Sequence, residues 1–301
     1  MHIPFNISIN LVTIWKLFNK WILKRKEKVM CLKKLFSRWC NKPNPTSVGD
    51  IVPTSKRALL FGINAYPDSP LNGCVNDVDD IEKLINHFYT GVDIRKFTDF
   101  QCTRQKIKDE LLNSVKALRI GDHLYFHYSG HGTQVYDTHG DELDGYDEAI
   151  YTIDGPIVDQ EFHEILSLVP FGAYVTLAFD SCFSGTITKL FNIHRNRFYQ
   201  IPGLPFRQKV RKRLAVTSEL DSMNWVVLSG CSENQTSADA WIAGKYNGAF
   251  TYYMTKVFTP ELNWDNLMFE IKKYLPGPYY DQIPTLEGAW NLCTSKLFTN
   301  N

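Results

Sequence analysis

Two short motifs contain residue types that suit nucleophilic chemistry. Residues 128–132 read Tyr-Ser-Gly-His-Gly, and residues 180–185 read Asp-Ser-Cys-Phe-Ser-Gly. Their histidine, His131, and their cysteine, Cys182, stand 51 residues apart. A thiol is only a few per cent thiolate at neutral pH, and a neighbouring imidazole activates it by taking its proton. The two motifs therefore indicate a cysteine nucleophile served by a histidine base.

The elements before the motifs must position these two side chains. Each motif follows an apolar run, residues 124–128 in the first case and residues 175–179 in the second. Continuous apolar runs of this length predict strands buried on both faces, as in parallel sheets. Such sheets place catalytic groups at the carboxyl ends of their strands. We therefore expect the imidazole and the thiol at one sheet edge, with neighbouring glycines letting backbone N–H groups approach a substrate carbonyl.

The remainder of the chain from about residue 57 alternates strand and helix patterns. Apolar runs predict further strands, and apolar residues at helical spacing predict helices between them. The strands are expected at 58–63 and 225–228, and the helices at 75–88, 107–118, 160–168, 248–258 and 264–275. This order predicts an α/β fold with a mostly parallel central sheet flanked by helices.

Composition sets the broad class of the protein. The chain has 301 residues, of which 44% are hydrophobic, enough for a sizeable core. No apolar run reaches the eighteen or so residues typical of a membrane-spanning helix. The seven cysteines form no CxxC pair, which argues against a disulfide framework and a structural zinc site. A reducing compartment, and so a cytoplasmic location, is expected.

The formal charge of +1 hides an uneven distribution. Residues 1–43 carry eight Lys and two Arg against one Glu, about +9, which leaves about −8 for the remainder. Apolar residues at helical spacing over 11–22 predict a basic amphipathic helix, which suits an anionic membrane surface. Alternatively, this segment could pack as a cap on the main domain or form a mobile extension. We expect residues 1–50 to form an arm and linker, and residues 51–301 the main domain.

The motifs together resemble the metacaspases, a group of caspase-fold cysteine peptidases. Caspases place their histidine about fifty residues before the cysteine. The caspase signature QACxG is absent, and the cysteine motif instead resembles the metacaspase form Asp-x-Cys-x-Ser-Gly. Three more stretches support the resemblance: 73–77, 140–148 and 230–239. It covers about residues 55–295 and implies a caspase-like fold with a large-subunit region at 55–190, a basic linker at 191–223 and a small-subunit region at 224–301.

The resemblance implies roles for the motif residues. His131 would be the general base and acid, and Cys182 the nucleophile that forms a thioester acyl-enzyme. The backbone N–H groups of Gly132 and Cys182 would hold the oxyanion. A cysteine endopeptidase, acting on proteins or peptides as a monomer, is the function expected from this resemblance.

The resemblance also implies which residues line the primary specificity pocket. Asp77, Ser129 and Asp180 fall on the corresponding family positions. Two carboxylates in a pocket would pair a guanidinium or ammonium group and repel an acidic one. We therefore expect cleavage after Arg or Lys. Such an enzyme could process itself within its own basic linker, and the run from Lys209 to Arg213 is the predicted site.

Calcium is a candidate activator by the same resemblance. Asp147 and Asp159 match family positions that would bind it. Gln160 replaces what is usually a second adjacent aspartate, and Lys189 stands where another aspartate would be expected. Because calcium needs several oxygen ligands, and a lysine would repel it, the activation is expected to be weakened or missing.

Two functions of other classes remain as alternatives. The first is a non-catalytic caspase-fold scaffold or regulator docked on a membrane by the basic arm. The second is nucleic-acid binding through the same arm, which is not expected because no recognition motif is present and the main domain is acidic. Retention of both His131 and Cys182 favours the peptidase.

Overall fold

A computed structural model describes residues 54–137, 145–182, 195–204, 224–231 and 238–299. The chain divides into two units, Met1–Val52 and Pro53–Asn301, and the first lies outside the described residues. The predicted basic arm therefore lies outside the described part of the chain. No helix among the described residues is long and apolar enough to cross a membrane.

A six-stranded sheet with the order β12-β9-β7-β3-β1-β2 forms the centre of the fold. Every pair of neighbours is parallel except β12 with β9. The prediction of an α/β fold with a mostly parallel sheet is confirmed. The strands are β1 (Lys56–Gly62), β2 (Val92–Thr98), β3 (His123–Ser129), β7 (Tyr174–Asp180), β9 (Val226–Ser229) and β12 (Thr285–Gly288).

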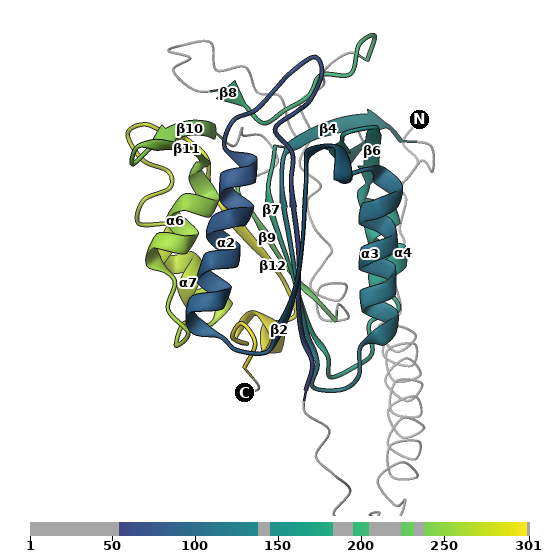
Figure 1. Ribbon diagram of the computed structural model, residues 1–301, viewed down its shortest axis with the longest axis vertical. Helices are drawn as coiled ribbons and strands as arrows, with labels where there is room; N and C mark the ends of the chain where they lie inside the picture. The colour runs from purple at the N-terminus through teal and green to yellow at the C-terminus, as the bar shows by residue number, and fades with distance from the viewer. Residues whose placement is uncertain (1–53, 138–144, 183–194, 205–223, 232–237, 300–301) are drawn as a thin grey trace, which may run out of the picture. The chain divides into compact units, whose positions relative to one another are not determined.

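Helices cover both faces of this sheet. Figure 1 shows α2 (Cys74–Phe88), α6 (Ala249–Val257) and α7 (Trp264–Ile271) on one side and α3 (Arg104–Ala117) and α4 (Asp159–Leu166) on the other. A short 3-10 turn, η1 (Asp99–Gln101), and α8 (Trp290–Cys293) complete the helical elements of the described residues. The five longer helices agree with the predicted ranges to within a few residues, except that α7 ends four residues early.

Alternation along the strands divides the apolar side chains between two cores. In β1, Leu59 and Phe61 belong to the core beneath α3 and α4, whereas Ala58 and Leu60 belong to the core beneath α2, α6 and α7. Successive side chains of a strand point to opposite faces, so a strand covered on both sides must be apolar throughout. This is why β1 appears in the sequence as an unbroken apolar run.

Two small antiparallel sheets lie near the carboxyl ends of the parallel strands (Figure 1). One contains β4 (His131–Tyr136), β5 (Tyr146–Thr152) and β6 (Gly155–Val158); the other contains β8 (Arg195–Asn196), β10 (Ala238–Ile242) and β11 (Lys245–Gly248). Sequence analysis missed these strands. Short strands with mixed polarity carry no clear period, and their pairing depends on residues distant in the chain.

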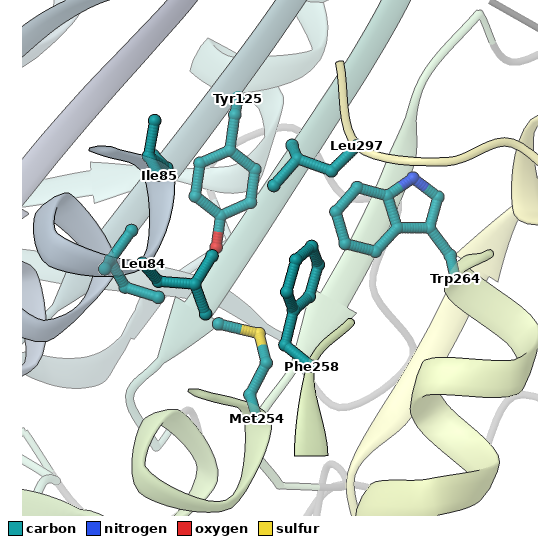
Figure 2. Close-up of a pocket in the computed structure, with 8 residues that line it drawn as sticks. Leu84, Ile85, Tyr125, Met254, Phe258, Trp264 and Leu297 are labelled. Carbon is teal, nitrogen blue, oxygen red and sulfur yellow. The ribbon is translucent and has the colours of Figure 1, made fainter. Parts of the chain in front are cut away.

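An apolar pocket lies within the core beneath α2, α6 and α7. Its lining comes from those helices, from Tyr125 of β3 and from Leu297. Figure 2 shows Met254, Phe258 and Trp264 arranged around the Tyr125 ring. Neither His131 nor Cys182 lines this pocket, so it belongs to the packing of the core.

Replacement of Phe126 by alanine tests the packing beneath α3 and α4. Phe126 of β3 is fully buried and contacts the rings of Phe61, Phe162 and Phe179. Its loss should lower the free energy of unfolding in urea by about 3–5 kcal/mol through lost burial and a residual cavity. The control Phe171→Ala removes a ring that is 84% exposed, and it should change the free energy of unfolding by less than about 0.5 kcal/mol. Equal losses in the two variants would contradict this packing.

Candidate active site

The register of the central strands gathers both sequence motifs at one edge of the sheet. Ser129, the last residue of β3, pairs with Asp180, the last residue of β7. His131 follows two residues after Ser129, and Cys182 follows two residues after Asp180. Both side chains are fully buried. The expected meeting of the imidazole-bearing and thiol-bearing segments is observed in this register.

The backbone N–H groups of Gly132 and Cys182 converge on one carbonyl oxygen. That oxygen belongs to Arg197 of the same chain, at 2.8 Å from the Gly132 nitrogen and 3.3 Å from the Cys182 nitrogen. A side chain at position 132 would overlap the Cys182 carbonyl, so only glycine permits this approach. Paired N–H donors of this kind stabilise the negative oxygen that develops during acyl transfer.

The His131 ring is held in one orientation and one tautomer. Its Nε2 lies 2.7 Å from the Ser69 carbonyl, which can only accept, so Nε2 carries the proton. Nδ1 is buried and has no hydrogen-bond partner among the described residues. The Tyr66 ring packs on the imidazole at a centroid distance of 4.5 Å, and its hydroxyl accepts from the His131 backbone N–H. The lone pair of Nδ1 is thus available to receive a proton.

Burial dominates the titration of this imidazole. It lowers the pKa of His131 to about 4, and backbone groups of Ser69 and Arg197 offset only part of the shift. Charging the ring would require placing a cation in a poorly solvated site. With Arg197 in place, His131 is therefore neutral at physiological pH, which is the form that a general base requires.

The three predicted pocket residues lie together at the same edge. Asp77 is in the first turn of α2, where the Asn64 side chain accepts from the Cys74 backbone N–H at 2.9 Å. The Ser129 hydroxyl donates to the Asp77 carboxylate at 2.7 Å. Asp77, Ser129 and Asp180 are all fully buried. Sequence reasoning thus grouped three side chains that the structure places together, although they come from three separate elements.

The Arg197 side chain occupies the space between these residues. Its Nη2 lies 2.8 Å from Asp77, and its Nη1 lies 2.7 Å from the Ser129 hydroxyl and 3.3 Å from the Asp180 carboxylate. The guanidinium is fully buried. The backbone on its amino-terminal side, residues 195–196, pairs with β10 as the short strand β8. Arg197 is therefore held through both its backbone and its side chain.

Asp239 is a third carboxylate of this pocket, which sequence analysis missed. It lies 3.2 Å from Nη2 of Arg197 and also accepts from the backbone N–H groups of Asn72 and Gly73. The one available signal was its place at the end of the 230–239 stretch, which supported the family resemblance without assigning it a role. We call Asp77, Ser129, Asp180 and Asp239 the acidic pocket.

The acidic pocket is electrostatically matched to a cation. Burial raises the pKa of Asp77 to about 7, while the Arg197 guanidinium opposes that shift. Burial alone would lower the pKa of Arg197, but nearby acidic groups raise it well above its usual value. The Gly248 backbone also packs tightly against this pocket, since a Cβ at that position would overlap the Asp180 carboxylate and the Arg197 guanidinium. A planar cation with several donors suits this pocket, whereas an acidic side chain does not.

The predicted calcium ligands lie elsewhere, on the sheet that contains β4, β5 and β6. Asp147 is a buried residue of β5, and Asp159 begins α4 directly after β6. The described residues contain no group of three acidic, histidine or cysteine side chains that could hold a metal ion. Lys189 lies outside the described residues. The described donors do not by themselves form a calcium site, and no catalytic step is assigned to calcium.

Two further predictions also fall outside the described residues. The run Lys209–Arg213, predicted as the self-processing site, lies in the segment 205–223. The membrane prediction rests on residues 1–43. Both stay predictions from sequence.

Comparisons with known proteins agree with this geometry. The family described as metacaspase, peptidase C14 domain, matches residues 56–191. Botryotinia fuckeliana Metacaspase-1 is 34% identical over an alignment that covers 81% of this chain and 70% of that protein. The chain belongs to the metacaspase family of cysteine peptidases. Its caspase-like fold is thereby established.

Other relatives extend the comparison. Metacaspase-1 of Cryptococcus neoformans and of Schizosaccharomyces pombe are each 33% identical, over 81% and 77% of this chain. This chain spans 64% and 66% of their respective lengths. A crystal structure of a Geobacter sulfurreducens protein matches with a TM-score of 0.63 and 28% identity, over 81% of this chain and 98% of that one. The family match over residues 56–191 covers both motifs and the strands β1, β2, β3 and β7.

Replacement of Gly132 by alanine should remove activity through one added methyl group. The Cβ would overlap the Cys182 carbonyl and displace the two N–H donors from their shared oxygen. Loss of such donors should lower kcat/KM for a peptide substrate by at least about 100-fold. The control Tyr136→Ala changes a residue of the same strand that is 55% exposed and should retain activity. Near-normal kcat/KM in folded Gly132→Ala would exclude this carbonyl-binding arrangement.

Proposed function

We propose that this metacaspase is a cysteine endopeptidase that cleaves after arginine, with lysine as a poorer alternative. One observation carries the proposal: Arg197 is held as a substrate would be. Its carbonyl oxygen accepts from Gly132 and Cys182, and its guanidinium is bound by the acidic pocket. A chance position of a surface arginine would not satisfy both its backbone and its side chain in a fully buried site.

The proposed reaction uses the two motif side chains directly. Nδ1 of His131 accepts the thiol proton as Sγ of Cys182 attacks the substrate carbonyl carbon. The N–H groups of Gly132 and Cys182 stabilise the resulting oxyanion. The C–N bond then breaks, and His131 delivers the proton to the leaving amine, which leaves a thioester on Cys182. Water activated by His131 hydrolyses the thioester, releasing the carboxylate product and restoring the thiol.

The proposed preference for arginine over lysine follows from geometry. Nη1 and Nη2 of the guanidinium together contact all four side chains of the acidic pocket. A lysine ammonium is a single point charge and cannot present donors at both positions simultaneously. Aspartate would meet three carboxylates and be rejected by repulsion.

Short fluorogenic peptides ending in Arg, Lys or Asp test this specificity. Cleavage should be fastest after Arg, slower after Lys and absent after Asp, and Cys182→Ala should abolish it. Asp239→Asn should lower kcat/KM for the Arg peptide about tenfold or more by weakening a charge-assisted hydrogen bond. The control Asp93→Asn alters a half-exposed carboxylate of β2 and should have little effect.

Two results would contradict this assignment. Comparable cleavage after Asp would remove the acidic pocket from substrate recognition. Absence of turnover by folded wild-type protein, with and without millimolar calcium, would favour the non-catalytic scaffold.

We also propose that the chain processes itself at the bond between Arg197 and Phe198. The Arg197 carbonyl already accepts from the two N–H donors that would activate it. While uncut, this segment fills the acidic pocket and excludes other substrates. Cleavage would separate the large-subunit region from the small-subunit region, as the predicted linker cut would, but twelve residues before Lys209.

Amino-terminal sequencing of the processed protein tests the site. Wild-type protein should yield a fragment beginning at Phe198, and Cys182→Ala should remain intact. Arg197→Ala should lose this fragment, because the acidic pocket no longer receives a cation, whereas Arg197→Lys should retain slow processing. A variant with Lys209, Arg211, Lys212 and Arg213 all changed to alanine should still yield it. Equal processing of wild type and Arg197→Ala at position 198 would refute the assignment.

Calcium activation, a cytoplasmic location and membrane contact through residues 1–43 are proposals that rest on the sequence alone. Peptide cleavage measured with and without millimolar calcium tests the calcium activation. Sedimentation with anionic vesicles, before and after deletion of residues 1–43, addresses the membrane contact.

A further inference from the structure

The chain continues past Arg197 along the edge of β4. Phe198 lies opposite Gly132 in a parallel bridge. Tyr199 then donates its backbone N–H to the Gly132 carbonyl at 2.8 Å, and its own carbonyl accepts from the Thr133 hydroxyl at 2.8 Å. Both backbone polar groups of Tyr199 are therefore satisfied by β4. These contacts depend on the backbone and would accept any residue other than proline at this position.

The Tyr199 side chain, in contrast, meets a specific partner. Its ring stacks on Tyr151 of β5, with centroids 4.0 Å apart and planes inclined by 16°. It also lies 6.0 Å, centroid to centroid, from the His131 ring. Tyr151 and Tyr199 are both partly exposed, so the stack opens to solvent. Another peptide could therefore offer its own ring to Tyr151 once the Arg197 segment has left.

Tyr151 is rigidly placed beside the proposed catalytic histidine. The register of β4 with β5 sets Tyr151 directly opposite His131. The Tyr151 carbonyl accepts from the hydroxyls of Tyr66 and Tyr128, at 2.8 and 2.7 Å. The strand that carries the stacking ring is thus tied to the same tyrosines that surround His131. The ring projects from a backbone fixed in this way and offers a surface for a planar partner.

We propose that Tyr151 and the β4 edge form a subsite for an aromatic side chain located two residues after the scissile bond of a protein substrate. This inference rests on the proposed function, because Arg197 fixes the direction and position of the bound chain. The hydrogen bonds of Gly132 and Thr133 place the substrate backbone. The Tyr151 ring then selects the side chain, since stacked aromatic pairs are favourable beyond the area they bury.

Internally quenched peptides that differ at one residue test the subsite. One peptide contains Asn-Arg-Phe-Tyr, and its partners replace the final tyrosine with leucine or alanine. The full-length wild-type protein and its Arg197→Ala variant, whose own segment no longer competes, are assayed in parallel. We expect kcat/KM to be roughly five- to tenfold higher for tyrosine than for leucine.

Variants assign that preference to Tyr151. Tyr151→Ala should reduce the tyrosine-to-leucine ratio to near one, whereas Tyr151→Phe, which keeps the ring, should preserve it. The control Tyr136→Ala removes an exposed tyrosine of β4 and should also preserve it. A preference that survives in Tyr151→Ala would overturn the assignment.

An arginyl coumarin amide distinguishes failure of this inference from failure of the proposed function. It has no residue two positions after the cleaved bond and so reports the acidic pocket and the chemistry alone. Coumarin release by wild-type protein with equal rates for the three peptides would overturn the aromatic subsite only. No hydrolysis of any arginine substrate would overturn the proposed function and the subsite with it. Should Tyr151→Ala fail to fold, equal rates for the three peptides with the wild-type protein would still overturn the subsite.

Discussion

The burial of one guanidinium among three carboxylates is the interaction on which the proposed site depends. Charges are costly to bury unless they are paired and hydrogen-bonded. The two Nη atoms of Arg197 meet that condition through Asp77, Asp180 and Asp239, which belong to α2, β7 and β10, whereas its Nε has no hydrogen-bond partner among the described residues. The same ion-pair network links three elements that come from distant parts of the sequence. Removal of the guanidinium would leave like charges facing one another, which favours either another cation or protonation of a carboxylate.

The parallel sheet makes this convergence possible. The pairing of Ser129 with Asp180 aligns the ends of β3 and β7, and each strand continues directly into a reactive motif. The close backbone approach of Gly132 to Cys182 follows from this alignment and leaves no space for a side chain. Substrate binding as we propose it combines two separable parts. Backbone hydrogen bonds place the chain, while the acidic pocket and the Tyr151 ring select its side chains.

One segment of the chain links the proposed specificity, regulation and processing. Within residues 195–199, the first two pair with β10, Arg197 lies in the acidic pocket and Tyr199 stacks on Tyr151. A segment bound in this way would inhibit the site until it is cut. Its sequence would also resemble that of a good substrate, because both must satisfy the same contacts. Self-inhibition and substrate choice, as we propose them, would therefore both follow from the same geometry.

The sequence alone determined the α/β fold, the apolar strands that precede His131 and Cys182, and the family. These features are local: an apolar run, a helical period or a motif of adjacent residues is encoded within a few positions. It also grouped Asp77, Ser129 and Asp180, through motifs that the family resemblance connects. Only the tertiary structure brought Asp239, Tyr151 and Arg197 to these residues. Their places depend on strand register and on pairing between distant segments such as β8 and β10, and no local pattern of residues specifies contacts of that kind.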